Sequence, residues 1–103
     1  MKHFENVTVL TKANIYFDGK CVSHTIECSD GSKKTLGVIF PGRLTFNTNA
    51  PERMQITDGT CRVRIAQDPS SQQYQAGQSF SIPANSSFEI ETEEVLNYIC
   101  HFE

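Results

Sequence analysis

The sequence lacks any apolar run of about 18 residues, the length that a membrane-spanning helix needs, which argues against a membrane partner. It also lacks an excess of basic residues, because 9 Lys and Arg stand against 12 Asp and Glu and give a net charge of −3. Nucleic-acid backbones are bound by basic patches, so this balance argues against a nucleic-acid partner. Residues 1–6 contain no apolar signal core, and we therefore expect a cytoplasmic location.

Close cysteine pairs are missing as well, although the chain contains four cysteines: Cys21, Cys28, Cys61 and Cys100. Structural zinc sites usually contain such pairs of ligands, and disulfides are rare in a reducing cytosol. We therefore predict free thiols on strands. Cys100 has additional interest because its segment also carries Tyr98.

Helical periodicity is absent, and short segments with alternating apolar and polar side chains are separated by Gly, Pro, Asn and Asp turns. This pattern predicts an all-β fold, and 103 residues are enough for one domain with one core. The pattern alone leaves a barrel and a sandwich open. Residues 1–13 are expected to form an N-terminal extension with an edge or interface strand, and residues 14–103 the main β-domain.

The stretch from Gly42 to Gly59 organises the chain. Its first half alternates apolar and polar residues, as a half-buried strand does. Pro51 then ends the strand because it has no N–H to donate, and a second strand leads to a turn at Asp58-Gly59. A related stretch, with the same order of a strand and a proline turn, follows between residues 77 and 88.

The spacing of these two stretches resembles the two cupin motifs. Phe46 and Thr48 stand where the first motif has its His-x-His pair, and Glu52 and Gly59 follow at the motif's spacing. In the second motif Phe88 replaces the histidine, after Gly77, Pro83 and Asn85. The resemblance implies a cupin-like jelly-roll barrel over residues 14–103. It also implies the loss of three of the four usual metal ligands, so we predict no metal and no cofactor.

A closer resemblance, from about Asn14 to Phe102, is to the small bacterial pyrimidine/purine nucleoside phosphorylases. It rests on five groups of residues: Tyr16-Phe17-x-Gly19-Lys20, Gly42-x-x-Thr45-Phe46-x-Thr48-x-x-Pro51-Glu52-x-Met54, Tyr74-x-x-Gly77, Pro83-x-x-Ser86-x-Phe88 and Tyr98-x-Cys100. It implies an enzyme of broad specificity that cleaves nucleosides with inorganic phosphate to a free base and a pentose 1-phosphate. Fold analogy further predicts a homodimer.

Two other functions stay open at this point. A non-enzymatic cupin-like protein that binds a sugar or a nucleoside needs the same pocket without a phosphate site. A metal-dependent isomerase or dioxygenase is disfavoured, because Phe46 and Phe88 occupy ligand positions and the histidines His3, His24 and His101 are scattered.

Aromatic residues are the predicted walls of the pocket, because flat bases stack on aromatic faces. The candidates are Phe46, Tyr74, Phe88 and Tyr98, and the alternative for each is a purely structural place in the barrel core. Tyr98 is in addition a candidate catalytic residue, because its phenol O–H can donate to a leaving base or to a sugar oxygen.

Polar candidates complete the predicted site. Glu52 is expected to point into the barrel, where it hydrogen-bonds the ribose or acts on the charge that develops at C1′; the alternative is a surface ion pair. Lys20 is the predicted cation for phosphate, with a solvated surface position as its alternative. Thr48 and Cys100 are predicted substrate contacts.

Overall fold

We describe residues 3–102 of a computed structural model. Within this range the chain forms strands joined by tight turns and one short 3-10 turn, η1. The elements are β1 (Thr8–Val9), β2 (Asn14–Tyr16), η1 (Phe17–Gly19), β3 (Cys21–Glu27), β4 (Lys33–Ile39), β5 (Gly42–Asn47), β6 (Glu52–Asp58), β7 (Thr60–Ile65), β8 (Gln72–Gln75), β9 (Ser79–Ile82), β10 (Ser87–Thr92) and β11 (Leu96–Phe102). The predicted all-β fold is therefore confirmed.

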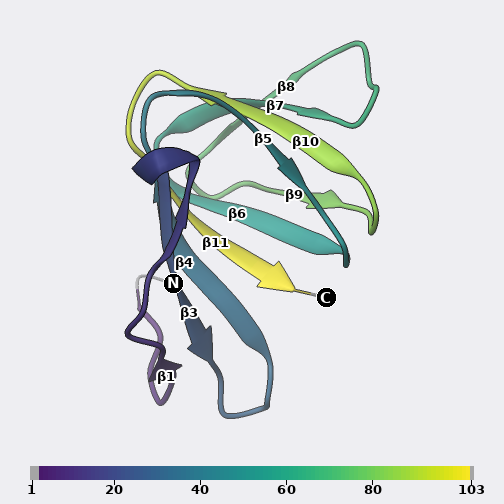
Figure 1. The fold of residues 1–103 in the computed structure, drawn as a ribbon. Helices are drawn as coiled ribbons and strands as arrows, with labels where there is room; N and C mark the ends of the chain where they lie inside the picture. Colours follow the sequence, from purple (N-terminus) through teal and green to yellow (C-terminus); the bar gives the residue numbers. More distant parts are fainter. Residues whose placement is uncertain (1–2, 103) are drawn as a thin grey trace.

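The strands form two antiparallel sheets that face each other (Figure 1). The larger sheet has the order β1-β3-β4-β11-β6-β9, with β2 paired to the same strand, β3, as β1. The smaller sheet has the order β5-β10-β7-β8. Consecutive strands such as β5 and β6 lie in different sheets, and this exchange of the chain between the two sheets is the jelly-roll arrangement that the motifs implied.

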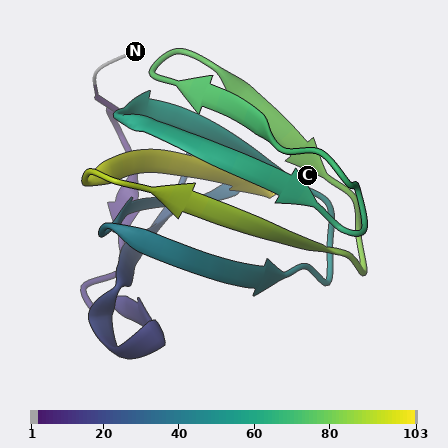
Figure 2. The same cartoon turned by 90° about the horizontal axis from the view of Figure 1, so that it is seen from above.

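The N-terminal residues lie along one edge of the larger sheet. Strand β1 pairs with the outer end of β3, and β2 begins at Asn14, the residue at which the sequence places the start of the barrel domain. That division of the chain stays a prediction. Figure 2 shows η1 and the neighbouring N-terminal residues, in dark blue and purple, beside the strands at one end of the barrel. No described helix is long and apolar enough to cross a membrane.

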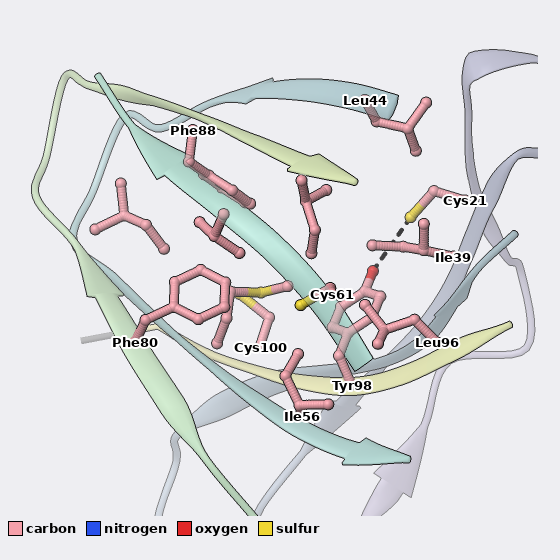
Figure 3. Packing of buried hydrophobic residues seen from close by; sticks show 14 residues of the cluster. Cys21, Ile39, Leu44, Ile56, Cys61, Phe80, Phe88, Leu96, Tyr98 and Cys100 are labelled. Atoms are coloured by element: carbon pink, nitrogen blue, oxygen red, sulfur yellow. Dashed lines mark hydrogen bonds between the residues drawn. The ribbon is translucent and has the colours of Figure 1, made fainter. Parts of the chain in front are cut away.

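The core fills the space between the sheets (Figure 3). It contains aliphatic, aromatic and cysteine side chains from both sheets, among them Cys21, Ile39, Leu44, Ile56, Cys61, Val63, Phe80, Ile82, Phe88, Ile90, Leu96, Tyr98 and Cys100. Burial of such apolar area, at roughly 25 cal/mol per Å², is the main stabilising term of a fold of this size. All four cysteines are free thiols, as predicted, but Cys28 lies just after β3 and not on a strand, and it is the one that is partly exposed.

One irregularity interrupts the pairing of β6 with β11. Asn97 pairs with Asp58, whereas the next residue, Tyr98, pairs with Ile56. Thr57 is therefore an extra residue on β6, which is a β-bulge. Thr57 and Asp58 are both exposed, while Ile56 is fully buried.

Candidate functional site

A cavity of about 150 Å³ lies between the two sheets. Its walls come from strands that are distant in sequence: Tyr16, Ser23, Thr35, Phe46, Asn47, Glu52, Met54, Phe88, Tyr98, Cys100 and Phe102 line it. The strand alternation that buries the core also turns these side chains inward. A larger hollow of about 420 Å³ lies over the opposite face of the larger sheet, against Val22, Leu36 and Val38. We take the smaller cavity as the candidate site because it contains a half-buried carboxyl group and most of the predicted site residues.

Glu52 stands at the start of β6 and is half-buried in this cavity. The Cys100 thiol on the neighbouring strand β11 donates to Glu52 Oε1 at 3.5 Å. Removal from water raises the pKa of the Glu52 carboxyl above its usual value, and the hydrogen bond from Cys100 only partly opposes this effect. The group is thereby suited to hold a proton or to accept a hydrogen bond from a sugar hydroxyl.

Tyr98 is buried, and its phenol oxygen lies 3.3 Å from Cys21 Sγ, as the dashed line in Figure 3 marks. Burial raises the pKa of the Tyr98 phenol well above its usual range, and the neighbouring Cys21 adds to the effect. The phenol therefore stays protonated at physiological pH and can donate a hydrogen bond. Ser23 is a second partner of this phenol, and Asn14 Nδ2 in turn donates to Ser23 Oγ at 3.2 Å.

Gly37 provides the space for the Tyr98 ring. The two residues face each other on β4 and β11, and a Cβ atom added to Gly37 would lie 2.6 Å from Tyr98 Cζ and from its hydroxyl. Real Cβ atoms do not approach other atoms so closely, so an alanine here requires the ring to move. Gly37 thus determines where the phenol lies in the cavity.

Four aromatic rings gather at one side of the cavity. Phe46 of β5 and Phe88 of β10 are stacked, with ring centroids 5.3 Å apart and an interplanar angle of 19°. The rings of Tyr16 and Phe17 meet Phe46 edge-on, at 6.2 and 5.2 Å. Tyr16, Phe46 and Phe88 line the cavity, whereas Phe17 packs against Phe46 from outside the lining. The flat apolar surfaces of the lining suit a planar aromatic ligand.

The structure brings most of the predicted site residues together: Glu52, Tyr98, Phe46, Phe88 and Cys100 line the same cavity. The other three, Lys20, Thr48 and Tyr74, are not part of its lining. Lys20 is exposed just after η1, and Tyr74 packs against Phe80 at the core, with ring centroids 4.7 Å apart.

Thr48 connects two loops instead. Its hydroxyl donates to the Pro83 carbonyl oxygen at 2.7 Å and accepts from the Ser86 N–H at 3.0 Å. The residue is almost fully buried, so both bonds are protected from water. Thr48 thereby ties the turn after β5 to the turn before β10, at the end of the barrel that holds Phe46 and Phe88.

The lining is rich in uncharged donors and poor in charge. Ser23, Thr35, Asn47 and Tyr98 contribute hydroxyl and amide groups, and Glu52 is its one carboxyl; the described lining contains no Lys or Arg. Within residues 3–102 no three His, Cys, Asp or Glu side chains converge as a metal would require. Glu52 and Cys100 are the two potential ligands in the cavity, and Phe46 and Phe88 fill the motif positions of the lost histidines.

Six lining residues were absent from the predicted set: Tyr16, Ser23, Thr35, Asn47, Met54 and Phe102. Tyr16 was accessible to sequence reasoning, because it belongs to the quoted Tyr-Phe-x-Gly-Lys segment. Ser23 and Thr35 were not, because only the pairing of β3 with β4 places these small polar residues on the inner face.

Comparison with known proteins agrees with this geometry. The family model of pyrimidine/purine nucleoside phosphorylase matches residues 11–102. A protein of that name from Cupriavidus necator is 63% identical over 102 residues, which cover 99% of this chain and 97% of the relative. Another from Methylobacillus flagellatus is 55% identical over the full length of both chains.

Solved structures support the fold. A protein of unknown function from an Acinetobacter species superposes with a TM-score of 0.96, at 56% identity and with 98% of each chain covered. Oxalate decarboxylase from Bacillus subtilis superposes with a TM-score of 0.73 over the whole of this chain and 30% of its own, and its 10% identity extends the likeness to the fold alone. The predicted cupin-like fold is thereby confirmed. The chain belongs to the pyrimidine/purine nucleoside phosphorylase family and is an enzyme of this kind, as its sequence motifs predicted.

Proposed function

We propose that the protein cleaves both purine and pyrimidine nucleosides with inorganic phosphate and releases a free base and a pentose 1-phosphate. The observation that carries the proposal is the cavity itself, in which stacked Phe46 and Phe88 lie opposite the half-buried carboxyl of Glu52. Aromatic faces hold a base without distinguishing its hydrogen-bonding edge, which supports broad specificity. The family name supports the reaction.

The reaction exchanges one bond at C1′ for another. A phosphate oxygen attacks C1′, the glycosidic C–N bond breaks, and its electron pair leaves with the base, which takes up a proton. We assign the sugar hydroxyls to Glu52 and the hydrogen bond to the leaving base to the protonated Tyr98 phenol. Positive charge develops at C1′ in the transition state, and the nearby carboxylate stabilises it in a cavity of low polarity.

We assign the binding of phosphate to uncharged hydrogen-bond donors of the lining together with Lys20. The described lining offers hydroxyl and amide donors from Thr35 and Asn47 but no cation, so a positive charge must come from outside the lining. Lys20 lies directly after η1, whose neighbour Tyr16 lines the cavity, and it is the cation that the sequence predicts for this role. No cofactor takes part in this scheme.

We also propose that the enzyme is a cytoplasmic homodimer. Two large apolar side chains on the N-terminal edge, Val9 and Leu10, are more than two-fifths exposed. A second copy that adds to this edge would cover part of that surface. Size-exclusion chromatography with light scattering should give twice 11.6 kDa, and a monomer mass would exclude the dimer.

The test of function follows the release of base. The purified protein is incubated with uridine and with adenosine, with and without phosphate, and the free base is measured by chromatography. We expect release that requires phosphate and persists in EDTA. Glu52→Gln should abolish most of it, whereas Glu93→Gln, the same change at an exposed position, should not. Binding of nucleosides without any release would favour the non-enzymatic binding protein, and loss of release in EDTA would favour a metal enzyme.

A further inference from the structure

The candidate cavity is too small for the ligand that it is proposed to hold. Its volume is about 150 Å³, whereas pockets for small organic ligands usually measure roughly 300–1,000 Å³. A nucleoside therefore needs part of the wall to move away. The question is which part of the wall is able to do so.

The buried part of the wall is fixed by sheet pairing. Met54, Phe88 and Tyr98 stand in the middle of the sheets with neighbours on both sides, and each is at most 7% exposed. Strand β6 for example pairs with both β9 and β11. Displacing any of these side chains would open the hydrophobic core, so we exclude them as the moving part.

The Tyr16–Gly19 turn is different because Tyr16 ends a short strand with a single neighbour, and Phe17–Gly19 form η1, which belongs to neither sheet. Tyr16 is the last residue of β2, which pairs only with β3, and Tyr16 and Phe17 are 46% and 44% exposed. Their rings contact the opposite wall edge-on at Phe46. In Figure 2 the turn lies beside the strands rather than between them.

The backbone of this turn is also strained. Phe17 and Asp18 have φ angles of 52° and 55°, and Gly19 follows with 94°. Positive φ is costly for a residue with a bulky side chain, by roughly 1–3 kcal/mol in general, and is favourable only for glycine. The edge-on contacts of Tyr16 and Phe17 with Phe46 offset part of this cost. If the two rings contact a base in place of Phe46, the free energy of the turn therefore changes little.

We propose that the Tyr16–Gly19 turn is the lid of the nucleoside pocket. It swings away from Phe46 to admit the nucleoside and then closes, so that the rings of Tyr16 and Phe17 cover a base that lies on Phe46. Tyr16 and Phe17 are in this scheme residues that contact the base and limit its size. The inference rests on the proposed function only for the identity of the ligand.

A fluorescent side chain in the turn tests the lid without any need for catalysis. The chain contains no tryptophan, so Phe17→Trp introduces a single indole whose emission reports its surroundings. Titration with free adenine, and separately with free uracil, should quench this emission to saturation as the indole stacks on the base. Val95→Trp, at a similarly exposed apolar position outside the cavity, is the control and should not respond. No quenching at Phe17→Trp, or equal quenching in both variants, would overturn the lid.

Kinetics give a second test in an active enzyme. Tyr16→Ala should raise KM for adenosine by about five- to 150-fold, as expected for the loss of one ring that stacks on a base, and should change kcat much less. Ile15→Ala, at a neighbouring residue that is 65% exposed and lies outside the lining, is the matched control. Equal KM values for Tyr16→Ala and the parent would overturn the lid and leave phosphorolysis intact. Quenching by bases in a protein that cleaves no nucleoside would support the lid and refute the proposed reaction.

Discussion

Replacing Gly37 with alanine should force the Tyr98 ring out of its place in the cavity. The added Cβ would lie 2.6 Å from Tyr98 Cζ and from its hydroxyl oxygen, and the strand pairing of β4 with β11 prevents the backbones from separating freely. Inserting a methyl group into a packed interior costs about 1–3 kcal/mol. Gly37 does not have a positive φ, so its backbone conformation suits alanine as well. Alanine restricts the unfolded chain more than glycine does, and this effect alone would stabilise the protein by about 0.4–1 kcal/mol. The net loss of stability is about 1–2 kcal/mol.

Thermal unfolding followed by circular dichroism measures this loss. For a domain of this size 1 kcal/mol corresponds to about 4–8 °C, so Tm should fall by about 5–15 °C. The same substitution in a Tyr98→Leu background is the control, because leucine lacks the ring atoms that the new Cβ meets, and there the loss should largely disappear. A Gly37→Ala variant with the parent's Tm or a higher one would refute the reasoning.

Three further outcomes follow from the site. Glu52→Gln should stabilise the protein at neutral pH. The pKa of the Glu52 carboxyl is raised in the folded state, so the parent loses stability as pH rises from the usual glutamate range through the raised value. Urea unfolding at several pH values should show this loss in the parent and not in the variant. In the native protein Ellman's reagent should react first with Cys28, which is partly exposed. Burial raises the pKa of the Cys61 thiol to about 11 and also raises the pKa values of Cys21 and Cys100, so these three thiols form little of the reactive thiolate. Equal rates for all four thiols would contradict the buried core. Thr48→Val should lower stability by about 1–3 kcal/mol in urea unfolding because it leaves the Ser86 N–H without its partner; a large rise in KM at unchanged stability would instead make Thr48 a substrate contact.

The sequence predicted the fold because its signals were local and regular. Alternation indicated strands, and glycine or proline turns marked where they end. Phe46, Glu52 and Phe88 could be placed in one pocket because the spacing of each motif fixes where its residues lie on two successive strands and the turn between them. The comparison with relatives then confirmed the family and the enzyme class.

Other parts of the site depend on contacts between distant strands, which local patterns do not encode. Ser23 and Thr35 look like surface positions in the sequence, and only the register of β3 and β4 turns them inward. Lys20 looks suited to phosphate because of its motif, yet its exposed position leaves that role to experiment. Gly37 resembles any strand glycine until the Tyr98 ring opposite it is seen.

The bulge in β6 has a consequence for the permitted length of the chain. Removing one residue from a regular strand turns every later side chain to the opposite face. At the bulge this is not so, because Thr57 and Asp58 already point to the same, exposed side after the buried Ile56. A chain without Thr57 would keep Met54 and Ile56 in the core and Asp58 in solvent. Position 57 is therefore where this strand can lose a residue, in evolution or by design, without changing the lining of the cavity.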